Sequence, residues 1–351
     1  MLITGKSKEA DEFSMKVFGK PFDKLKYAMF TNYVHTNLIE GEQLTRTGLY
    51  AWLPSFNGIV RQFQEVDPSE YEDYDIIQIN MSAQDMHIPQ KVRDKIGSNS
   101  KTKIICNNDY TIELWSSSFD YPEGWKHSYD AADMIFGTEP YQVGALEVLL
   151  GRKVHLVTHP CFVKRLKSLR PKNKTNLISV VAHRYDNNVI PPSIAIANIP
   201  NTRTRLIGYD PNSDKKKYVT SCCYNYVVSG TNYQDFCDSM LESLLVIDPF
   251  TLTSQSRTGW DCASMGIPMI GSDRNESART CYPYTICDPY DVKKIRELTI
   301  KVLNDEEFRK KVISYAQKAV ECVSYENSVH KFLKALDEGS NKIDINKIEV
   351  E

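Results

Sequence analysis

The sequence predicts an α/β protein made of two consecutive Rossmann-like domains. Its 351 residues exceed what one ordinary hydrophobic core accommodates. Short apolar runs alternate with helix-like segments in both halves, as in parallel sheets covered on both faces. A basic segment interrupted by proline, Cys161–Asn176, separates the two halves. We therefore expect one domain over residues 1–165, a second over 166–337 and a polar tail over 338–351.

In the first half, the apolar runs are short enough to be strands. The segment between the first two runs, Thr47–Phe63, has helical stretches interrupted by Pro54. Glu139–Gly151 has the pattern of a helix, and Gly151 is suited to end it. The predicted strands are Leu25–Thr31, Tyr74–Asn80, Lys101–Asn108, Ala131–Gly137 and Lys153–Pro160.

The second half restarts the alternation after the basic segment. Its predicted strands are Asn176–Arg184, Thr204–Asp210, Tyr224–Asn232, Leu244–Phe250 and Pro268–Asp273. Its predicted helices are Ile190–Ile199, Gln234–Ser243, one starting near Gly259, Asp291–Asn304, Asp305–Val323 and Glu326–Asp337. Two such domains predict a cleft between them, where ligands meet the carboxyl ends of the strands.

The composition of the chain limits the classes of protein to which it can belong. The net charge of −2 gives no overall basic field for nucleic acid, although a local patch remains open. No apolar run is long enough for a transmembrane helix, and the start of the chain lacks the apolar core of a signal peptide. The nine scattered cysteines favour reduced thiols and a cytoplasmic location. His155 and His159 have helical metal spacing but fall on a predicted strand, so we expect no metal site.

The segment Ser256–Ser277 has an unusual pattern. Its helix has small side chains that allow close approach to a sheet, and Gly266-Ile267-Pro268 turns it into a buried strand. The Ser/Thr-rich loop before the helix and the helix N-terminus predict an anion-binding site. Asp261 lies early in this helix, where it either complements the helix dipole or binds a ligand.

This segment resembles the donor-site motif of GT-B-fold glycosyltransferases, especially the large retaining family 4-like group. The resemblance covers most of Asn176–Leu336. It implies two Rossmann-like domains facing a central cleft, and a nucleotide-diphosphate sugar, UDP- or GDP-linked, as donor. It also implies no bound cofactor and no catalytic metal. In that family two glutamates flank the loop and helix; here Thr253 and Asp261 occupy their places.

The resemblance also implies roles for individual residues. Asp261 would bind the ribose, and Arg184 would bind the diphosphate, because guanidinium pairs with phosphate oxygens. A lysine that the family places shortly after this arginine is missing, and Asn187 and Asn188 stand near its position. Gly230 would contact the base. The donor loop and helix start would hold the leaving group through Ser254, Ser256, Arg257, Thr258 and Gly259.

The first half of the chain has fewer residues that point to a function. His35 and Asp85 are candidate bases for an inverting reaction, and a retaining reaction needs no dedicated base. His87, Asn107, Asn108 and Asp109 follow predicted strands, so a loop role and a cleft role both remain open for them. Glu139 begins a helix, where an acceptor-side role and capping explain it equally well.

The sequence thus predicts a hexosyltransferase-type glycosyltransferase that moves a sugar from a nucleotide-diphosphate donor to an acceptor hydroxyl, with retention favoured. The acceptor is open among a glycan, a lipid, a protein and a modified DNA base. Two alternatives share the fold: a nucleotide-sugar-binding module without activity, consistent with Thr253 and the missing lysine, and a nucleotide-sugar 2-epimerase.

Overall fold

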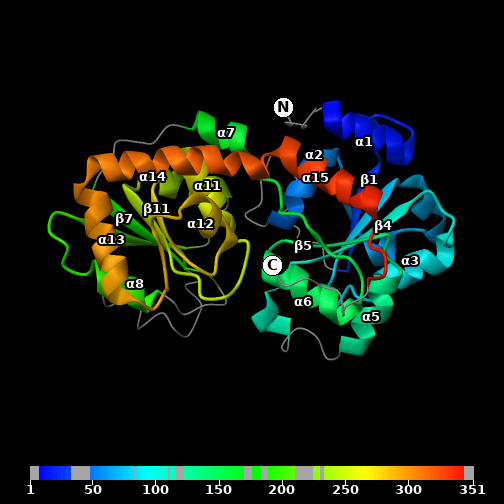
Figure 1. The fold of residues 1–351 in the computed structure, drawn as a ribbon, viewed down its shortest axis with the longest axis horizontal. Coiled ribbons are helices and arrows are strands. Elements are labelled where there is room, and N and C mark those ends of the chain that lie inside the picture. Colours follow the sequence, from blue (N-terminus) through cyan, green and yellow to red (C-terminus); the bar gives the residue numbers. More distant parts are fainter. Residues whose placement is uncertain are drawn as a thin grey trace. The chain divides into compact units, whose positions relative to one another are not determined.

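A computed structural model shows the chain as two compact units (Figure 1). It describes residues 8–32, 48–82, 84–109, 111–115, 122–169, 176–182, 189–209, 224–229 and 233–343. The first unit comprises Met1–Glu42, Thr47–Pro160 and Tyr325–Glu351, and the second comprises Gln43–Arg46 and Cys161–Ser324. Each unit is an α/β structure with its own sheet.

The first unit is built on a six-stranded parallel sheet in the order β2-β1-β3-β4-β5-β6. The strands are β1 (Tyr27–Thr31), β2 (Ile59–Gln62), β3 (Ile76–Asn80), β4 (Lys103–Asn108), β5 (Met134–Gly137) and β6 (His155–Leu156). The helices are α1 (Lys8–Phe18), α2 (Trp52–Phe56), α3 (Ile88–Ile96), α5 (Pro122–Asp130), α6 (Pro140–Leu150) and α15 (Tyr325–Glu338). Short 3-10 turns lie at Phe22–Lys24, Gly48–Ala51, Phe63–Glu65, Pro68–Asp73 and Ile112–Leu114.

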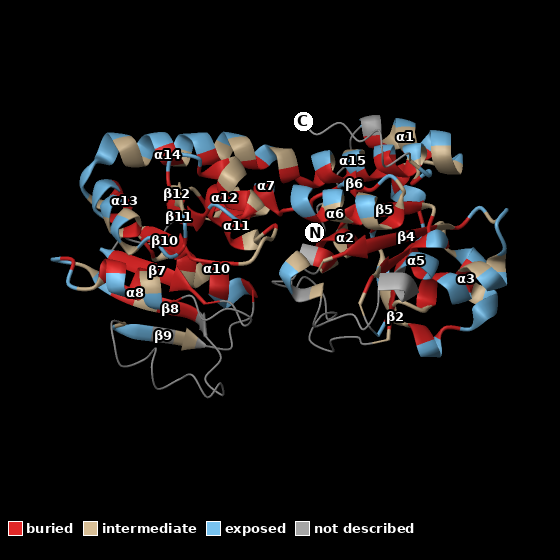
Figure 2. Ribbon diagram, turned by 60° about the horizontal axis from the view of Figure 1, so that its bottom comes forward, coloured by how far each residue is buried: buried red, intermediate tan, exposed pale blue. Residues whose placement is uncertain are grey.

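The central strands of this sheet, β1, β3, β4 and β5, are buried on both faces, which explains their apolar runs (Figure 2). Along β1, Ala28 and Phe30 belong to one core cluster, while Tyr27 and Met29 belong to the cluster on the opposite face. The alternation follows from the two-residue period of a strand. The predicted strands Leu25–Thr31 and Tyr74–Asn80 are confirmed as β1 and β3.

The core of the first unit includes a helix from the far end of the chain. Helix α15 buries Phe332 and Leu333 in the same cluster as Trp52 and Phe56 of α2. The sequence had assigned this helix to the second domain, but the structure groups it with the first unit. The reason is its apolar face, which fits the sheet of the first unit together with α1 and α2.

Strand β2 is a correction to the predicted helical stretches over Thr47–Phe63. The helix α2 ends at Asn57, whose φ of 49° is left-handed, and Ile59–Gln62 continues as an edge strand beside β1. The residues of β2 are exposed or half-buried, so they lack the apolar run that marks the central strands.

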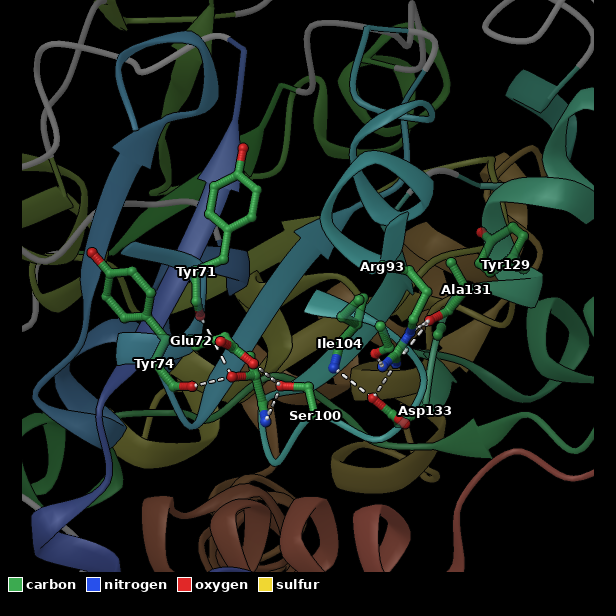
Figure 3. Close-up of polar contacts among 12 residues, drawn as sticks. Tyr71, Glu72, Tyr74, Arg93, Ser100, Ile104, Tyr129, Ala131 and Asp133 are labelled. Atoms are coloured by element: carbon green, nitrogen blue, oxygen red, sulfur yellow. Dashed lines mark hydrogen bonds and ion pairs between the residues drawn. The ribbon is translucent and has the colours of Figure 1, made fainter. Parts of the chain in front are cut away.

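At the edge where the strands begin, side chains hold helix α3 to the sheet (Figure 3). Arg93 donates to the carbonyl of Ala131 at 3.1 Å and to Asp133 Oδ2 at 2.7 Å. The same carboxylate oxygen accepts the backbone N–H of Ile104 at 2.8 Å.

The second unit has a parallel six-stranded sheet in the order β12-β11-β10-β7-β8-β9. The strands are β7 (Leu177–Val181), β8 (Arg203–Tyr209), β9 (Tyr226–Ser229), β10 (Leu245–Asp248), β11 (Met269–Ser272) and β12 (Ile286–Cys287). The helices are α7 (Val163–Ser168), α8 (Ile190–Ile196), α10 (Tyr233–Leu241), α11 (Arg257–Met265), α12 (Glu276–Cys281), α13 (Val292–Asn304) and α14 (Glu306–Ala319). A 3-10 turn follows at Val320–Val323.

Helix α7 changes the interpretation of the predicted linker. The segment Cys161–Asn176 was expected to be a polar connection, but Val163–Ser168 forms a helix. Its Val163 and Leu166 are buried, and the helix packs against α11. The sequence did not predict this helix, because its apolar residues are few and lie among lysines and an arginine.

Candidate functional site

The candidate site lies where strand β10 passes into helix α11 through a loop over residues 249–256. A second loop, after β11, holds this first one in place. The backbone N–H of Glu276 donates to Ser254 O at 2.9 Å, and that of Ser277 donates to Gln255 O at 3.1 Å. Arg274 adds a side-chain bond to Thr251 O at 2.9 Å. The loop therefore has a fixed shape at the carboxyl edge of the sheet.

Ser256 precedes α11 in an unusual conformation. Its φ of 40° lies in the left-handed region, which residues other than glycine rarely adopt. Its Oγ donates to Asp248 Oδ2 at 2.6 Å, and its N–H donates to Ser254 Oγ at 3.1 Å. Because the hydroxyl is directed to Asp248, Ser256 gives α11 no side-chain cap. The positive end of the helix is left available for an anion.

The small side chains of α11 allow tight packing against α12. A Cβ on Gly259 would lie 2.3 Å from Ser277 Oγ and 2.7 Å from Ser277 Cβ. Thr258 is buried as well, and Gly266 ends the helix with a φ of 71°. The predicted helix and its glycine stop are confirmed.

Asp261 is buried within the second unit, with an exposed fraction of 1%. Its Oδ1 accepts the Tyr233 hydroxyl at 2.8 Å, and Arg257 Nε lies 3.4 Å away. The thiol of Cys161 approaches the same oxygen at 3.7 Å. The other oxygen, Oδ2, is buried and has no hydrogen-bond partner among the described residues.

Burial raises the pKa of Asp261 above its ordinary value, while the Arg257 guanidinium and the hydrogen bond from Tyr233 act in the opposite direction. A ribose would reach this carboxylate only after a local rearrangement, because the side chain is 1% exposed.

Arg257 begins α11 with its guanidinium held against aromatic rings. Its Cζ lies 4.7 Å from the ring centroid of Tyr233 and 5.1 Å from that of Phe162. Cation–π contacts of this kind hold a cation in a partly buried place. The guanidinium therefore adds positive charge at the start of the helix.

The structure brings Ser254, Ser256, Arg257, Thr258, Gly259 and Asp261 together in the second unit.

Asp85 lies in the first unit after β3, where its carboxylate accepts hydrogen bonds from the end of β1 and from the residue that follows it. Its Oδ2 accepts Thr31 Oγ1 at 2.9 Å, and its Oδ1 accepts the N–H of Asn32 at 2.7 Å. His35, Arg184 and Gly230 lie outside the described residues.

Sequence reasoning missed a hydrogen-bonded triad in the first unit, in which Trp52 and His159 are buried and Asp109 is half-buried. Trp52 Nε1 donates to His159 Nδ1 at 2.9 Å, and His159 Nε2 lies 2.9 Å from Asp109 Oδ1. Because Nδ1 accepts a hydrogen bond, the imidazole proton lies on Nε2 and is donated to Asp109. Burial together with Asp85 and Asp109 raises the pKa of nearby Tyr50 to about 12. No local signal reveals the triad, because its members are far apart in sequence.

Glu139 caps helix α6. Its carboxylate oxygens accept the N–H groups of Gln142 at 2.6 Å and Tyr141 at 3.1 Å, which is the capping alternative left open by the sequence.

Among the described residues, no helix is long and apolar enough to cross a membrane. The same residues contain no group of three or more His, Cys, Asp or Glu side chains that could hold a metal ion.

No protein-family model and no curated protein sequence matches this chain. Solved structures do match it. Anabaena Alr3699/HepE in complex with UDP-glucose aligns with a TM-score of 0.66 and 12% identity, covering 90% of this chain and 100% of that one. An E. coli trehalose-6-phosphate structure bound with UDP-2-fluoro glucose aligns at 0.64 and 9% identity, covering 89% and 99%.

A UDP-forming α,α-trehalose-phosphate synthase from Burkholderia xenovorans aligns at 0.59 and 11% identity, covering 79% of this chain and 75% of that one. These neighbours are GT-B glycosyltransferases, and the predicted GT-B fold is confirmed. At such low identity the likeness establishes the fold and leaves the activity to be argued from the site.

Proposed function

We propose that the protein is a glycosyltransferase that uses a UDP-linked sugar as donor and an acceptor hydroxyl as substrate. The fold supports the proposal, because two of its structural neighbours were solved with UDP-glucose and UDP-2-fluoro glucose. The site supports it independently, because the uncapped start of α11 and the guanidinium of Arg257 match the negative charge of a diphosphate.

The observation that carries the proposal is the start of α11. Ser256 leaves the first amide groups of this helix without a side-chain cap, and the loop before it is held by the second loop. Helix N-termini bind phosphate through these amide groups and the helix dipole. The departing UDP carries negative charge, so the same groups stabilise it as the bond to the sugar breaks.

Arg257 and Asp261 would complete the donor site. The guanidinium of Arg257 would add positive charge for the diphosphate, with Tyr233 and Phe162 holding it in place. Asp261 would accept a ribose hydroxyl through Oδ2, the oxygen that lacks a partner among the described residues. Arg184 and Gly230 keep their proposed contacts with the diphosphate and the base.

We propose a retaining outcome, in which the leaving phosphate takes the acceptor proton. The family that the segment resembles has a carboxylate at the position of Thr253, so in this chain retention would proceed without an acidic side chain there. An inverting outcome would need a base such as His35 or Asp85. Both oxygens of Asp85 accept hydrogen bonds, so acting as a base would require releasing Thr31 or Asn32.

The direct test is calorimetric titration with UDP, UDP-glucose and the corresponding GDP compounds, followed by assay of donor hydrolysis. We expect UDP-linked sugars to bind and Asp261→Ala to abolish binding. Asp261→Asn is the milder variant, since its amide oxygen still accepts from Tyr233. Asp288→Ala, an exposed carboxylate of the second unit, is the matched control.

The outcomes separate the alternatives. Absence of binding by any nucleotide or nucleotide sugar would contradict the proposal. Binding without hydrolysis or transfer would favour a binding module. Conversion of the bound donor to its C2 epimer with release of UDP would identify an epimerase.

A further inference from the structure

We infer that Asp248 is a positioning residue for diphosphate recognition, acting through the backbone of Ser256. By holding Ser256 in its left-handed turn, it keeps the first amide groups of α11 directed at the phosphates. This inference rests on the proposed function and identifies a residue that the family resemblance does not assign.

Asp248 joins three parts of the site. It is the last residue of β10, pairs in register with Gly271 of β11, and is completely buried. Its Oδ2 accepts Ser256 Oγ at 2.6 Å and Asn275 Nδ2 at 3.4 Å. One carboxylate oxygen therefore links the end of a central strand to the loop before α11 and to the loop before α12.

The backbone of Ser256 explains why such a link is needed. Its φ of 40° is unfavourable for a residue with a Cβ, and such conformations persist only where the surroundings hold them. The two bonds available here are the one to Asp248 and the one from the Ser256 N–H to Ser254 Oγ at 3.1 Å. A charge-assisted bond as short as 2.6 Å is suited to this role.

The same bond directs the hydroxyl away from the helix. A serine before a helix ordinarily accepts from one of the first amide groups, but Ser256 makes no such bond. A second polar group on α11 also points to a ligand: Asp261 Oδ2 has no partner among the described residues, although Asp261 is only 1% exposed. Uncapped amides and an unpaired carboxylate oxygen on one helix fit a ligand that carries both phosphates and hydroxyls.

A burial argument separates this role from ordinary packing. A fully buried carboxylate is costly unless it is hydrogen-bonded, so an apolar side chain at the end of β10 would serve packing better. The polar residue is explained by the groups that it holds, which include the turn at Ser256 and the side chain of Asn275.

The test compares dissociation constants for UDP, uridine and inorganic pyrophosphate in the full-length protein. Ser256→Ala and Asp248→Ala should weaken UDP and pyrophosphate binding by about tenfold or more, since a loss of about 1.4 kcal/mol corresponds to tenfold. Uridine, which lacks phosphates, should bind with an unchanged constant. Ser179→Ala, which removes another buried hydroxyl bond of 2.7 Å in this sheet, is the matched control and should leave all three constants unchanged.

Glycine at position 256 provides the rescue. It adopts a φ of 40° without strain, so Ser256→Gly should retain UDP affinity within about threefold of wild type. In the Ser256→Gly background, Asp248→Ala should weaken UDP binding by less than about a further twofold, because the Ser256 hydroxyl through which Asp248 is inferred to act is gone. If Asp248→Ala fails to fold, Asp248→Asn and the two Ser256 variants carry the test.

Three results would overturn the inference. Equal weakening of UDP and uridine would show a general structural role. Unchanged UDP binding in Ser256→Ala would show that the turn is not held for the phosphates. If the wild type binds neither UDP nor pyrophosphate, both the inference and the proposed function are overturned. The first two results leave the proposed function standing.

Discussion

Asp261 shows how one buried side chain can lower the stability of the fold and still have a candidate role in binding. Its carboxylate is buried, and three donors, Tyr233, Arg257 and Cys161, lie within reach of the same oxygen. Burial opposes ionisation more than these donors favour it, so the pKa of Asp261 is raised. The raised pKa makes the cost of the charge measurable as a pH dependence of stability.

A folded-state pKa above the unfolded value means that the folded protein binds this proton more tightly. Asp261 therefore destabilises the fold above the raised pKa, and this cost disappears as pH falls through it towards the unfolded value. We expect the unfolding free energy of the wild type to rise relative to Asp261→Asn between about pH 7 and about pH 4. Urea titrations across this range measure the difference, and a flat or opposite trend would refute a raised pKa.

At the scale of elements, the contact between α11 and α12 depends on the absence of a side chain. Gly259 lies so close to Ser277 that an added Cβ would meet its side chain at 2.3 Å and its backbone carbon at 3.1 Å. The approach keeps α11 in place behind the loop, and with it the amide groups proposed to bind the diphosphate.

Gly259→Ala should destabilise the protein by about 1–3 kcal/mol, the usual cost of overpacking. Gly144→Ala, inside helix α6 where an added Cβ meets nothing within 4 Å, is the matched control. It should stabilise the protein by about 0.5–1 kcal/mol, because alanine favours a helix interior over glycine. Chemical denaturation of both variants tests this, and equal effects would show that the close approach is not maintained.

At the scale of the molecule, the chain leaves the first unit after Pro160 and returns to it at Tyr325. Helix α15 then completes the first core. Phe332 is fully buried, and its ring centroid lies 4.9 Å from Trp52, 5.2 Å from Phe56 and 5.9 Å from Phe136. The fold of the first unit thus requires residues from both ends of the sequence.

Phe332→Ala should cost about 3–5 kcal/mol of unfolding free energy, as is usual for removal of a buried phenylalanine. Lys334→Ala on the exposed face of the same helix should change stability by less than about 0.5 kcal/mol. Hydrogen exchange should assign the loss to the strands of the first unit. Loss of protection confined to the second unit would contradict the placement of α15.

Some features of the candidate site could be predicted from the sequence, and others could not. The helix of α11, its glycine stop and the strand after it follow from local spacing, and the sequence placed all three. The conformation of Ser256 and its bond to Asp248 could not be predicted, because a left-handed serine has no sequence signature and Asp248 has the pattern of the polar end of a strand. The triad of Trp52, His159 and Asp109 was missed for a similar reason.

The α/β class and the alternation of strands and helices follow from the amino-acid sequence alone, because apolar periodicity is local and a buried parallel strand needs an uninterrupted apolar run. The folded structure was needed to show which unit contains α15, that Ile59–Gln62 forms strand β2, and which donors surround Asp261. These features depend on contacts between residues distant in the chain, and such contacts form only when the chain has folded.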